Sequence, residues 1–245
     1  MAKIKAVVSY DGRGFSGFQR LKKGRSVQSE LEKALSTLED HPVSIVGAGR
    51  TDTGVSARGQ VIHFETDKKR LDLERYRFSF NRLLPKDILV TSLEVVPDSF
   101  HARYSAKGKV YSYSFHLGDR NVFSPYVTQV EVPKFDLGLF EKALSLFKGT
   151  HRFYRFTSKT EDSLDFVRTI DSIDLRREGD DIRVVFEGDG FMTYMIRLIV
   201  GACFHVAEGT MSLKDIETYL EETDKKTLPY KAPAQGLCLE EVRYE

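Results

Sequence analysis

The sequence predicts an α+β protein of two similar βαββαβ-like halves, each a mixed or antiparallel sheet with helices on its outer face. The first hundred residues alternate strand-like and helix-like segments in the order strand, helix, strand, strand, helix, strand. The second half roughly repeats that order without repeating the sequence. A chain of 245 residues is long enough for two domains, which we place at residues 1–104 and 105–245. Ferredoxin-like domains and RNA-recognition modules share this architecture, which by itself fixes no function.

Local signals place the elements of the first half. Residues 4–10 form a strand-like run and are expected to be the first strand. Ser26 is a good N-cap for a helix whose apolar residues fall on one face. Asp72 can cap a second helix, which Pro85 stops. The remaining strands are expected at residues 43–47, 60–66 and 88–95.

Local signals also organise the second half. Residues 109–117 alternate cleanly and predict a strand. Residues 191–207 are apolar nearly all round, which predicts a buried helix. The other expected elements are a helix at 136–148, a hairpin of 167–177 and 181–188 joined at Gly179, a short helix at 213–222 and a strand at 237–244.

Composition and patterning exclude several classes of protein. No apolar run approaches the roughly 18 residues of a membrane span, and no secretory signal precedes the first strand. Cys203 and Cys238 lie in apolar contexts, which predicts buried free thiols and a cytosolic protein. The lone histidines His63 and His151 are expected to be structural. No spacing suggests a metal site, a P-loop or a dinucleotide fingerprint.

The net charge of +1 hides an asymmetry between the two halves. Residues 1–120 carry 21 Lys and Arg against 14 Asp and Glu, whereas residues 121–245 carry 16 against 22. We therefore expect the first half to meet a polyanion.

One basic segment of the first half is interleaved with aromatic residues. Its cations and aromatic residues are Arg13, Phe15, Phe18, Arg20, Lys22, Lys23 and Arg25. A glycine-rich, basic, aromatic loop suits a phosphate backbone and unstacked bases. The alternative is a solvated loop whose lysines serve solubility.

The most informative segment is the loop at residues 47–57, which reads G-A-G-R-T-D-T-G-V-S-A. It places Asp52 two residues after Arg50 and between glycines, which let a ligand approach the backbone. The alternative is an aspartate that only caps a turn. The triplet D-T-G also occurs in aspartic proteases, but those enzymes need two such carboxylates, and this chain has one D-T-G. We therefore reject the protease class.

Arg197 and two tyrosines are the other candidate site residues. Arg197 lies in the middle of the most apolar expected helix, where an unpaired guanidinium is costly. Three interpretations are open for its guanidinium. It reaches the surface, it pairs with a structural carboxylate, or it pairs with Asp52 and keeps the Asp52 carboxylate ionised as a nucleophile. Tyr111 and Tyr113 share one face of their strand, either as core aromatics or with one as a stacking platform for a base.

Eight motifs run almost from end to end in an order that resembles one family, tRNA pseudouridine synthase A. They are Y-D-G-x-x-F-x-G-F-Q at 10–19, S-V-Q at 26–28, G-A-G-R-T-D-T-G-V at 47–55, G-Q-V-I-H-F at 59–64, F-H-A-R-Y-S-A at 100–106, K-V-Y-S-Y at 109–113, F-M-x-x-M-I-R at 191–197 and G-L-C-L at 236–239. The resemblance implies a pseudouridine synthase fold. It also implies an isomerase that converts uridine to pseudouridine at positions 38, 39 and 40 in the tRNA anticodon stem-loop.

The resemblance also implies roles for individual residues. Asp52 matches the catalytic aspartate of the family, Arg197 its ion-pair partner, and Tyr111 the tyrosine that stacks on the target base. Arg50 matches the basic residue beside the aspartate, and Leu237 an aliphatic residue that lines the site. The implied RNA-binding cations are Arg13, Arg20, Lys22, Lys23, Arg25, Arg58 and Arg103.

The implied protein is a cytoplasmic homodimer that binds the anticodon arm of tRNA and uses no cofactor, metal or membrane. The chain departs from the family pattern at Thr53, Ser56, Arg152, Thr193 and Tyr194. One alternative function is a non-catalytic RNA-binding module on the same fold, which leaves a buried Arg197 unexplained. Another is a hydrolase that uses Asp52 as nucleophile, for which no second carboxylate is placed as general acid.

Overall fold

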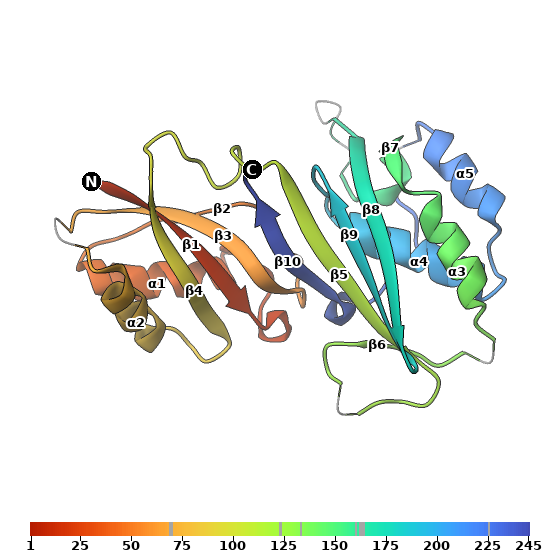
Figure 1. The fold of residues 1–245 in the computed structure, drawn as a ribbon, viewed down its shortest axis with the longest axis horizontal. Coiled ribbons are helices and arrows are strands. Elements are labelled where there is room, and N and C mark those ends of the chain that lie inside the picture. The colour runs from red at the N-terminus through yellow and green to blue at the C-terminus, as the bar shows by residue number, and fades with distance from the viewer. Residues whose placement is uncertain (69–70, 123, 133, 160, 162–164, 225) are drawn as a thin grey trace. The chain divides into compact units, whose positions relative to one another are not determined.

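The computed structural model describes residues 1–245 except 69–70, 123, 133, 160, 162–164 and 225 (Figure 1). Contacts within the chain divide it into two compact units, each containing sheet strands and helices. Unit 1 comprises residues 1–107 and 238–245, and unit 2 comprises residues 108–237. The predicted α+β class is therefore confirmed.

The sheet of unit 1 has the strand order β4-β1-β3-β10, and β2 pairs with β3. The strands are β1 (Ala2–Tyr10), β2 (Val46–Gly47), β3 (Ser56–Thr66), β4 (Ile88–Val96) and β10 (Leu237–Arg243). β1 runs antiparallel to both β3 and β4, so that Ile4 lies opposite Phe64 and Val95. β10 runs parallel to β3 and pairs Cys238 with Ser56.

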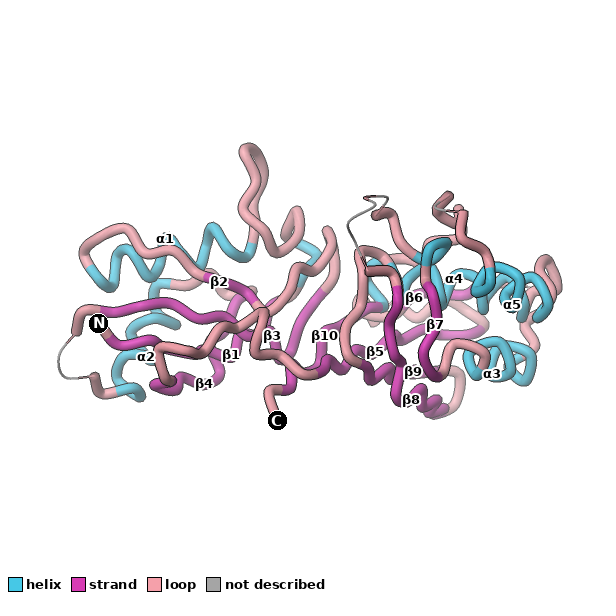
Figure 2. Tube along the Cα trace, turned by 90° about the horizontal axis from the view of Figure 1, so that it is seen from above, coloured by secondary structure: helices cyan, strands magenta, loops and turns pink. Residues whose placement is uncertain are grey.

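Two helices complete the core of unit 1. The helices are α1 (Val27–Glu39) and α2 (Leu73–Leu83), and Figure 2 shows α1 along one side of β1 and β3. Both predicted N-caps are confirmed, because the Ser26 side chain accepts the N–H of Ser29 and the Asp72 side chain accepts the N–H of Arg75. Phe64 of β3 packs against aromatic rings of α2.

The sheet of unit 2 has the strand order β5-β9-β8-β7, and β6 pairs with β5 in parallel. The strands are β5 (Gly108–Leu117), β6 (Thr128–Val130), β7 (Gly149–Arg152), β8 (Val167–Glu178) and β9 (Asp181–Gly188). The predicted hairpin turns at Gly179, whose positive φ of 61° suits glycine.

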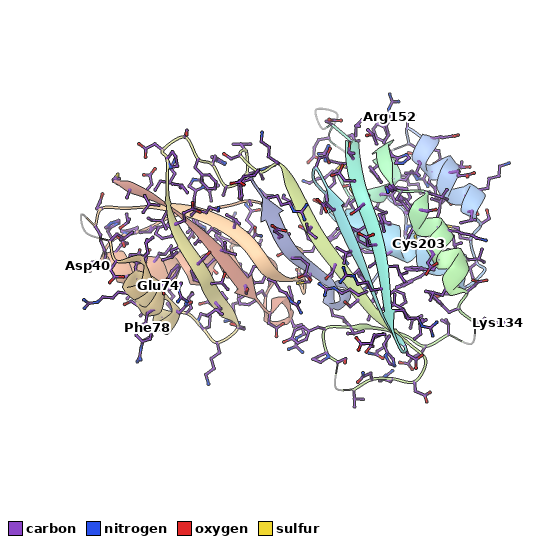
Figure 3. The ribbon with its side chains drawn as sticks, in the orientation of Figure 1. Asp40, Glu74, Phe78, Lys134, Arg152 and Cys203 are labelled. Atoms are coloured by element: carbon purple, nitrogen blue, oxygen red, sulfur yellow. The ribbon has the colours of Figure 1, made fainter. Side chains whose placement is uncertain are left out.

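The helices of unit 2 gather beside these strands (Figure 1). They are α3 (Leu137–Ser145), α4 (Met195–Ala207) and α5 (Leu213–Glu221). α4 is buried along most of its length, as predicted, and Figure 3 labels Cys203 within it. The helix starts at Met195 rather than at residue 191, because Tyr194 adopts a left-handed conformation with φ 65°.

Other differences from the sequence-based expectation have tertiary causes. β3 starts at Ser56 rather than at residue 60, because β10 pairs with the first residues of β3. β2 is shorter than expected, and the short strands β6 and β7 were not expected. Cys203 is buried and Cys238 is half-buried, both as free thiols, and burial raises the pKa of Cys238 to about 12. Over the described residues, no helix has both the length and the apolar character that a bilayer span needs.

Candidate active site

Asp52 lies in a tight turn of unit 1 that leads into β3. The N–H of Val55 donates to the carbonyl oxygen of Asp52 (3.1 Å), and Gly54 between them has φ +81°. A positive φ at the third position is what a type II turn requires, so glycine fits this position well. Asp52 is half-buried, whereas Arg50 is exposed.

A buried hydrogen-bond network holds the residue before Asp52. The Tyr10 hydroxyl lies 2.8 Å from Thr51 Oγ1, and both side chains are buried. Gln60 Nε2 donates to the carbonyl oxygen of Gly49 (3.2 Å) and to the Tyr10 hydroxyl (3.5 Å). Burial raises the pKa of Tyr10, so the hydroxyl stays neutral. Sequence reasoning missed this network, although Tyr10 opens one motif and Gln60 lies in another.

The basic segment packs against the Asp52 turn through its backbone. A Cβ atom on Gly17 would lie 3.0 Å from the carbonyl oxygen of Thr51, and the N–H of Phe18 donates to that same oxygen (3.1 Å). The N–H of Gly12 donates to Ser56 Oγ (3.0 Å). Ser56, a departure from the family pattern, therefore has a structural contact of its own.

Arg25 fastens the basic segment to the rest of unit 1. Its Nη1 and Nη2 donate to the Asp87 carboxylate at 2.6 and 2.8 Å, and its Nε donates to Glu30 at 3.0 Å. These bonds raise the pKa of Arg25. The Phe15 ring lies 4.2 Å from its guanidinium carbon. These contacts give Arg25 a structural role.

The other cations of the basic segment are more accessible. Arg13 Nη2 lies 2.6 Å from Asp11, and Arg20 Nη1 lies 2.9 Å from the buried Glu32. The exposed lysines of the segment are Lys22 and Lys23.

The two remaining RNA-binding candidates lie elsewhere in unit 1. Arg58, on β3, is exposed, with Nη1 3.8 Å from Glu240 Oε2. Arg103 is exposed in the loop between β4 and β5, and its guanidinium carbon lies 5.8 Å from the centre of the Tyr104 ring. The structure therefore spreads the predicted cations over unit 1.

The two tyrosines of β5 differ in environment. Tyr113 is fully buried, with its hydroxyl 2.7 Å from Thr128 Oγ1 and donating to the Pro233 carbonyl oxygen (2.9 Å). Tyr111 is 8% exposed, and its ring lies edge-on to Phe191 at 5.4 Å. Tyr113 is therefore a core residue, and Tyr111 remains the candidate for stacking.

Arg197 lies in the first turn of α4 and is 8% exposed. Its Nε donates to the carbonyl oxygen of Ala232 (2.7 Å), and the N–H of Ala232 donates to the carbonyl oxygen of Arg197 (3.0 Å). Ala232 belongs to the segment 232–237. In this segment the Pro233 carbonyl oxygen accepts the Tyr113 hydroxyl, and the last residue, Leu237, is buried. Within unit 2, this segment thus connects Arg197, Tyr113 and Leu237.

Sequence reasoning missed a second feature of unit 2, which surrounds Tyr194. The Lys231 ammonium lies 4.0 Å from the centre of the Tyr194 ring, and the Arg197 guanidinium carbon lies 5.5 Å from it. A left-handed conformation costs a non-glycine residue about 1–2 kcal/mol. A strained aromatic residue close to two cations is a candidate for a functional role.

The lone histidines make the contacts expected of structural residues. Nδ1 of the buried His63 accepts the N–H of Ala102 (3.0 Å), and burial lowers the pKa of His63 to about 4. His151 Nε2 lies 3.0 Å from the carbonyl oxygen of Lys148. In the described part of the chain, His, Cys, Asp and Glu form no group of three or more that could hold a metal ion.

Known proteins resemble this chain over its full length. A family model described as tRNA pseudouridine synthase matches residues 6–105 and 143–245. The curated tRNA pseudouridine synthase A of Streptococcus sanguinis is 40% identical over 250 residues, which cover 100% of both chains. Those of Anoxybacillus flavithermus and Aster yellows witches'-broom phytoplasma are 38% identical over 246 residues (100% of both chains) and 36% identical over 240 residues (98% of both chains). The solved structure titled "Crystal Structure of a Cbf5-Nop10-Gar1 Complex" aligns with a TM-score of 0.35 and 9% identity over 82% of this chain and 54% of that one, too little to support a conclusion.

The α+β units and the full-length similarity define an isomerase that acts on RNA. The chain belongs to the tRNA pseudouridine synthase family. The resemblance found in the motifs is thereby confirmed. The alternatives of a non-catalytic RNA-binding module and of a hydrolase have no support in these matches.

Proposed function

We propose that this chain isomerises uridine to pseudouridine at positions 38, 39 and 40 in the anticodon stem-loop of tRNA, with Asp52 as the nucleophile. The observation that carries the proposal is the Asp52 turn. Gly54 and the contacts of Thr51 hold this turn, and it presents a half-buried carboxylate beside a basic segment. A positioned carboxylate can form a covalent intermediate and split one difficult step into two easier ones.

The proposed reaction needs no group from outside the substrate. The bond from C1′ to N1 breaks, a bond from C1′ to C5 forms, C5 loses a proton and N1 gains one. Asp52 would attack the sugar at C1′, attack the base at C6 or promote elimination from the sugar, and each route uses one ionised carboxylate. The base must first leave its stack, because no side chain reaches it inside a stem.

Residues of unit 2 have proposed roles in the same reaction. Tyr111 would stack on the flipped base. Arg197 would pair with Asp52 and keep its carboxylate ionised, because an opposite charge nearby favours the charged form. The burial of Arg197 supports this role, since a buried guanidinium is stabilised by a carboxylate partner. Leu237 would line the site, and Arg50 would bind the substrate beside Asp52.

The proposed enzyme acts in the cytoplasm as a homodimer, binds the anticodon arm and requires no cofactor. The excess of cations in the first half supports a polyanionic substrate. The proposed RNA contacts are Arg13, Arg20, Lys22, Lys23, Arg25, Arg58 and Arg103.

The test is incubation with unmodified tRNA, followed by mapping of pseudouridine in the anticodon arm. Asp52→Asn and Asp52→Ala are expected to abolish product while leaving tRNA binding largely intact. A suitable control is Asp40→Asn, which removes a carboxylate of the same unit (labelled in Figure 3). Asp40 has φ 61°, a conformation that asparagine tolerates, so this variant is expected to fold and to retain full activity. Near-wild-type activity in either Asp52 variant, or product only outside the anticodon arm, would overturn the proposal.

A further inference from the structure

An exposed tyrosine in unit 1 is held in a fixed orientation. Tyr104 is 78% exposed, and its ring stacks on His101 with 4.3 Å between ring centres and 29° between planes. An aromatic ring exposed to this degree contributes little to a core. One face of the ring is occupied by the imidazole, which leaves the ring oriented rather than free to rotate.

Several hydrogen bonds join the residues of the turn that carries this ring. His101 Nδ1 accepts the N–H groups of Arg103 and Tyr104, both at 3.2 Å. The N–H of His101 donates to Ser105 Oγ (3.0 Å), and the N–H of Ser105 donates back to the His101 carbonyl oxygen (2.9 Å). Because Nδ1 accepts hydrogen bonds, it carries no proton, and the imidazole orientation is fixed.

The turn is also fastened to the sheet. Ala102, which is fully buried, donates its N–H to His63 of β3 (3.0 Å) and accepts the Tyr244 hydroxyl (2.7 Å). The His63 ring lies 5.0 Å from the His101 ring. The exposed ring is therefore preorganised by contacts that reach the core of unit 1.

A cation accompanies the ring. Arg103 is exposed, and its guanidinium carbon lies 5.8 Å from the centre of the Tyr104 ring. An aromatic face beside a guanidinium matches a nucleotide, whose base stacks and whose phosphate is neutralised. The charge of the first half favours an anionic partner over an apolar peptide.

This position is remote from Asp52. The turn is fastened to His63, whereas Asp52 precedes Ser56 at the other end of β3. Ser56 and His63 are seven residues apart, and a strand rises about 3.3 Å per residue, so they are separated by about 23 Å. A nucleotide on Tyr104 is therefore not the uridine that meets Asp52.

We propose that Tyr104, His101 and Arg103 form a stacking platform for an unpaired nucleotide of the tRNA other than the target uridine. This inference rests on the proposed function only in taking tRNA as the substrate. The platform acts in binding, so its loss weakens tRNA affinity and leaves the chemical step intact.

The test measures tRNA binding and turnover separately in the full-length protein. Base–aromatic stacking is worth about 1–3 kcal/mol by alanine substitution, so Tyr104→Ala is expected to raise the Kd for unmodified tRNA by about 5- to 150-fold. The KM should rise in parallel, and kcat at saturating tRNA should match the wild type. Tyr104→Trp keeps an aromatic face and should therefore retain the wild-type affinity for tRNA. Arg103→Gln should weaken binding and lower its salt slope by about 1.

The matched control is Phe78→Ala. Phe78 lies on α2 of the same unit (labelled in Figure 3), is 62% exposed, and has the Arg82 guanidinium carbon 5.9 Å from its ring. This pair resembles Tyr104 and Arg103 in exposure and cation distance, but a helix carries it, and its loss should leave Kd unchanged. The platform is overturned if Tyr104→Ala binds tRNA like the wild type, or if Phe78→Ala weakens binding equally. Failure of the proposed function is a different result, since the wild type would then bind tRNA without forming pseudouridine in the anticodon arm.

Discussion

The backbone of Gly17 lies close to the carbonyl oxygen of Thr51. A Cβ atom at position 17 would lie 3.0 Å from the Thr51 carbonyl oxygen, which already accepts the N–H of Phe18. Gly17 also has φ +101°, a conformation that other residues rarely adopt. The basic segment therefore packs closely against the turn that carries Asp52, and the glycine at position 17 permits this close approach.

Replacing this glycine is expected to damage activity more than stability. Gly17→Ala should lower the free energy of unfolding by about 1–3 kcal/mol, through backbone strain and the close contact. It should also reduce kcat/KM by roughly 100-fold, because a displacement of about 1 Å at a catalytic group can cost that much. Urea unfolding and single-turnover kinetics on tRNA measure the two effects.

Gly118→Ala is the matched control for Gly17→Ala. Gly118 has a similar φ of +96°, but a Cβ atom there would meet nothing within 4 Å. The two variants should share the cost of strain and differ in activity, with Gly118→Ala retaining wild-type kcat/KM. Equal activity in both variants would show that the contact with Thr51 does not position Asp52.

The Tyr10–Thr51 hydrogen bond predicts a coupled pair of substitutions. Tyr10→Phe removes the 2.8 Å partner of Thr51, and Thr51→Val leaves the Tyr10 hydroxyl only its 3.5 Å contact with Gln60, so each change should cost about 1–3 kcal/mol of unfolding free energy. The double variant removes both partners and should lose less than the two single losses combined. Urea unfolding of the four proteins gives the coupling energy, and strict additivity would mean that the 2.8 Å contact does not couple the residues energetically.

Elements with local signals could be predicted from the sequence, whereas element bounds that are set by distant contacts could not. Ser26 and Asp72 cap their helices because a short polar side chain needs only the N–H three residues later. The start of β3 at Ser56 escaped prediction because its partner there is Cys238, at the other end of the chain. The early start assigned to α4 failed because left-handed Tyr194 has no sequence signature.

The candidate site divides in the same way. The spacing of Arg50, Asp52 and Gly54 is visible in the sequence because a turn is a local structure. The contacts of Thr51 with Tyr10 and Gly17 depend on chain segments brought together by folding. Arg25 was expected to bind RNA because it lies in the basic, aromatic segment and because the resemblance implies that role. Its two hydrogen bonds to the Asp87 carboxylate become visible only in the tertiary structure.

Relief of the backbone strain at Tyr194 should offset most of the stability that is lost when its ring is removed. Tyr194→Gly relieves a left-handed conformation worth about 1–2 kcal/mol but loses cation–π contacts worth about 0.5–2 kcal/mol, so its free energy of unfolding should stay close to that of the wild type. It also removes the ring beside Arg197 and Lys231. Cation–π contacts are worth about 0.5–2 kcal/mol, so kcat should fall by roughly 2- to 30-fold.

Tyr194→Phe is the conservative partner of this variant. It keeps the ring and the strain, and should retain wild-type kcat with no gain in stability. A glycine variant as active as the wild type would exclude any role for the ring in orienting Arg197.

His63 predicts an acid-sensitive component of stability. Burial lowers its pKa to about 4 from an ordinary value of 6.5, and the nearby charge of Lys3 acts in the same direction. The unfolded chain therefore binds more protons between these values, and stability is lost as the pH falls from 6.5 to 4. The loss is about 3 kcal/mol at most, at about 1.36 kcal/mol per pKa unit.

His63→Gln tests this acid sensitivity, because glutamine keeps an acceptor for the N–H of Ala102 but does not titrate. Urea unfolding at pH 7 and pH 4.5 should show a smaller pH dependence in this variant than in the wild type. An identical dependence in the two proteins would assign the acid sensitivity to other groups.

Two variants of the basic segment test its charge and its structural contacts separately. Lys22 and Lys23 are exposed, and changing both to Gln should lower the slope of log K against log salt for tRNA by about 1.5–2, with stability unchanged. Arg25→Lys keeps the positive charge but loses the paired hydrogen bonds to the Asp87 carboxylate. It should therefore preserve the slope of log K against log salt and cost about 1 kcal/mol of unfolding free energy. Binding titrations across a salt series, with urea unfolding beside them, measure both. An unchanged slope in the double lysine variant would mean that these lysines do not contact phosphate.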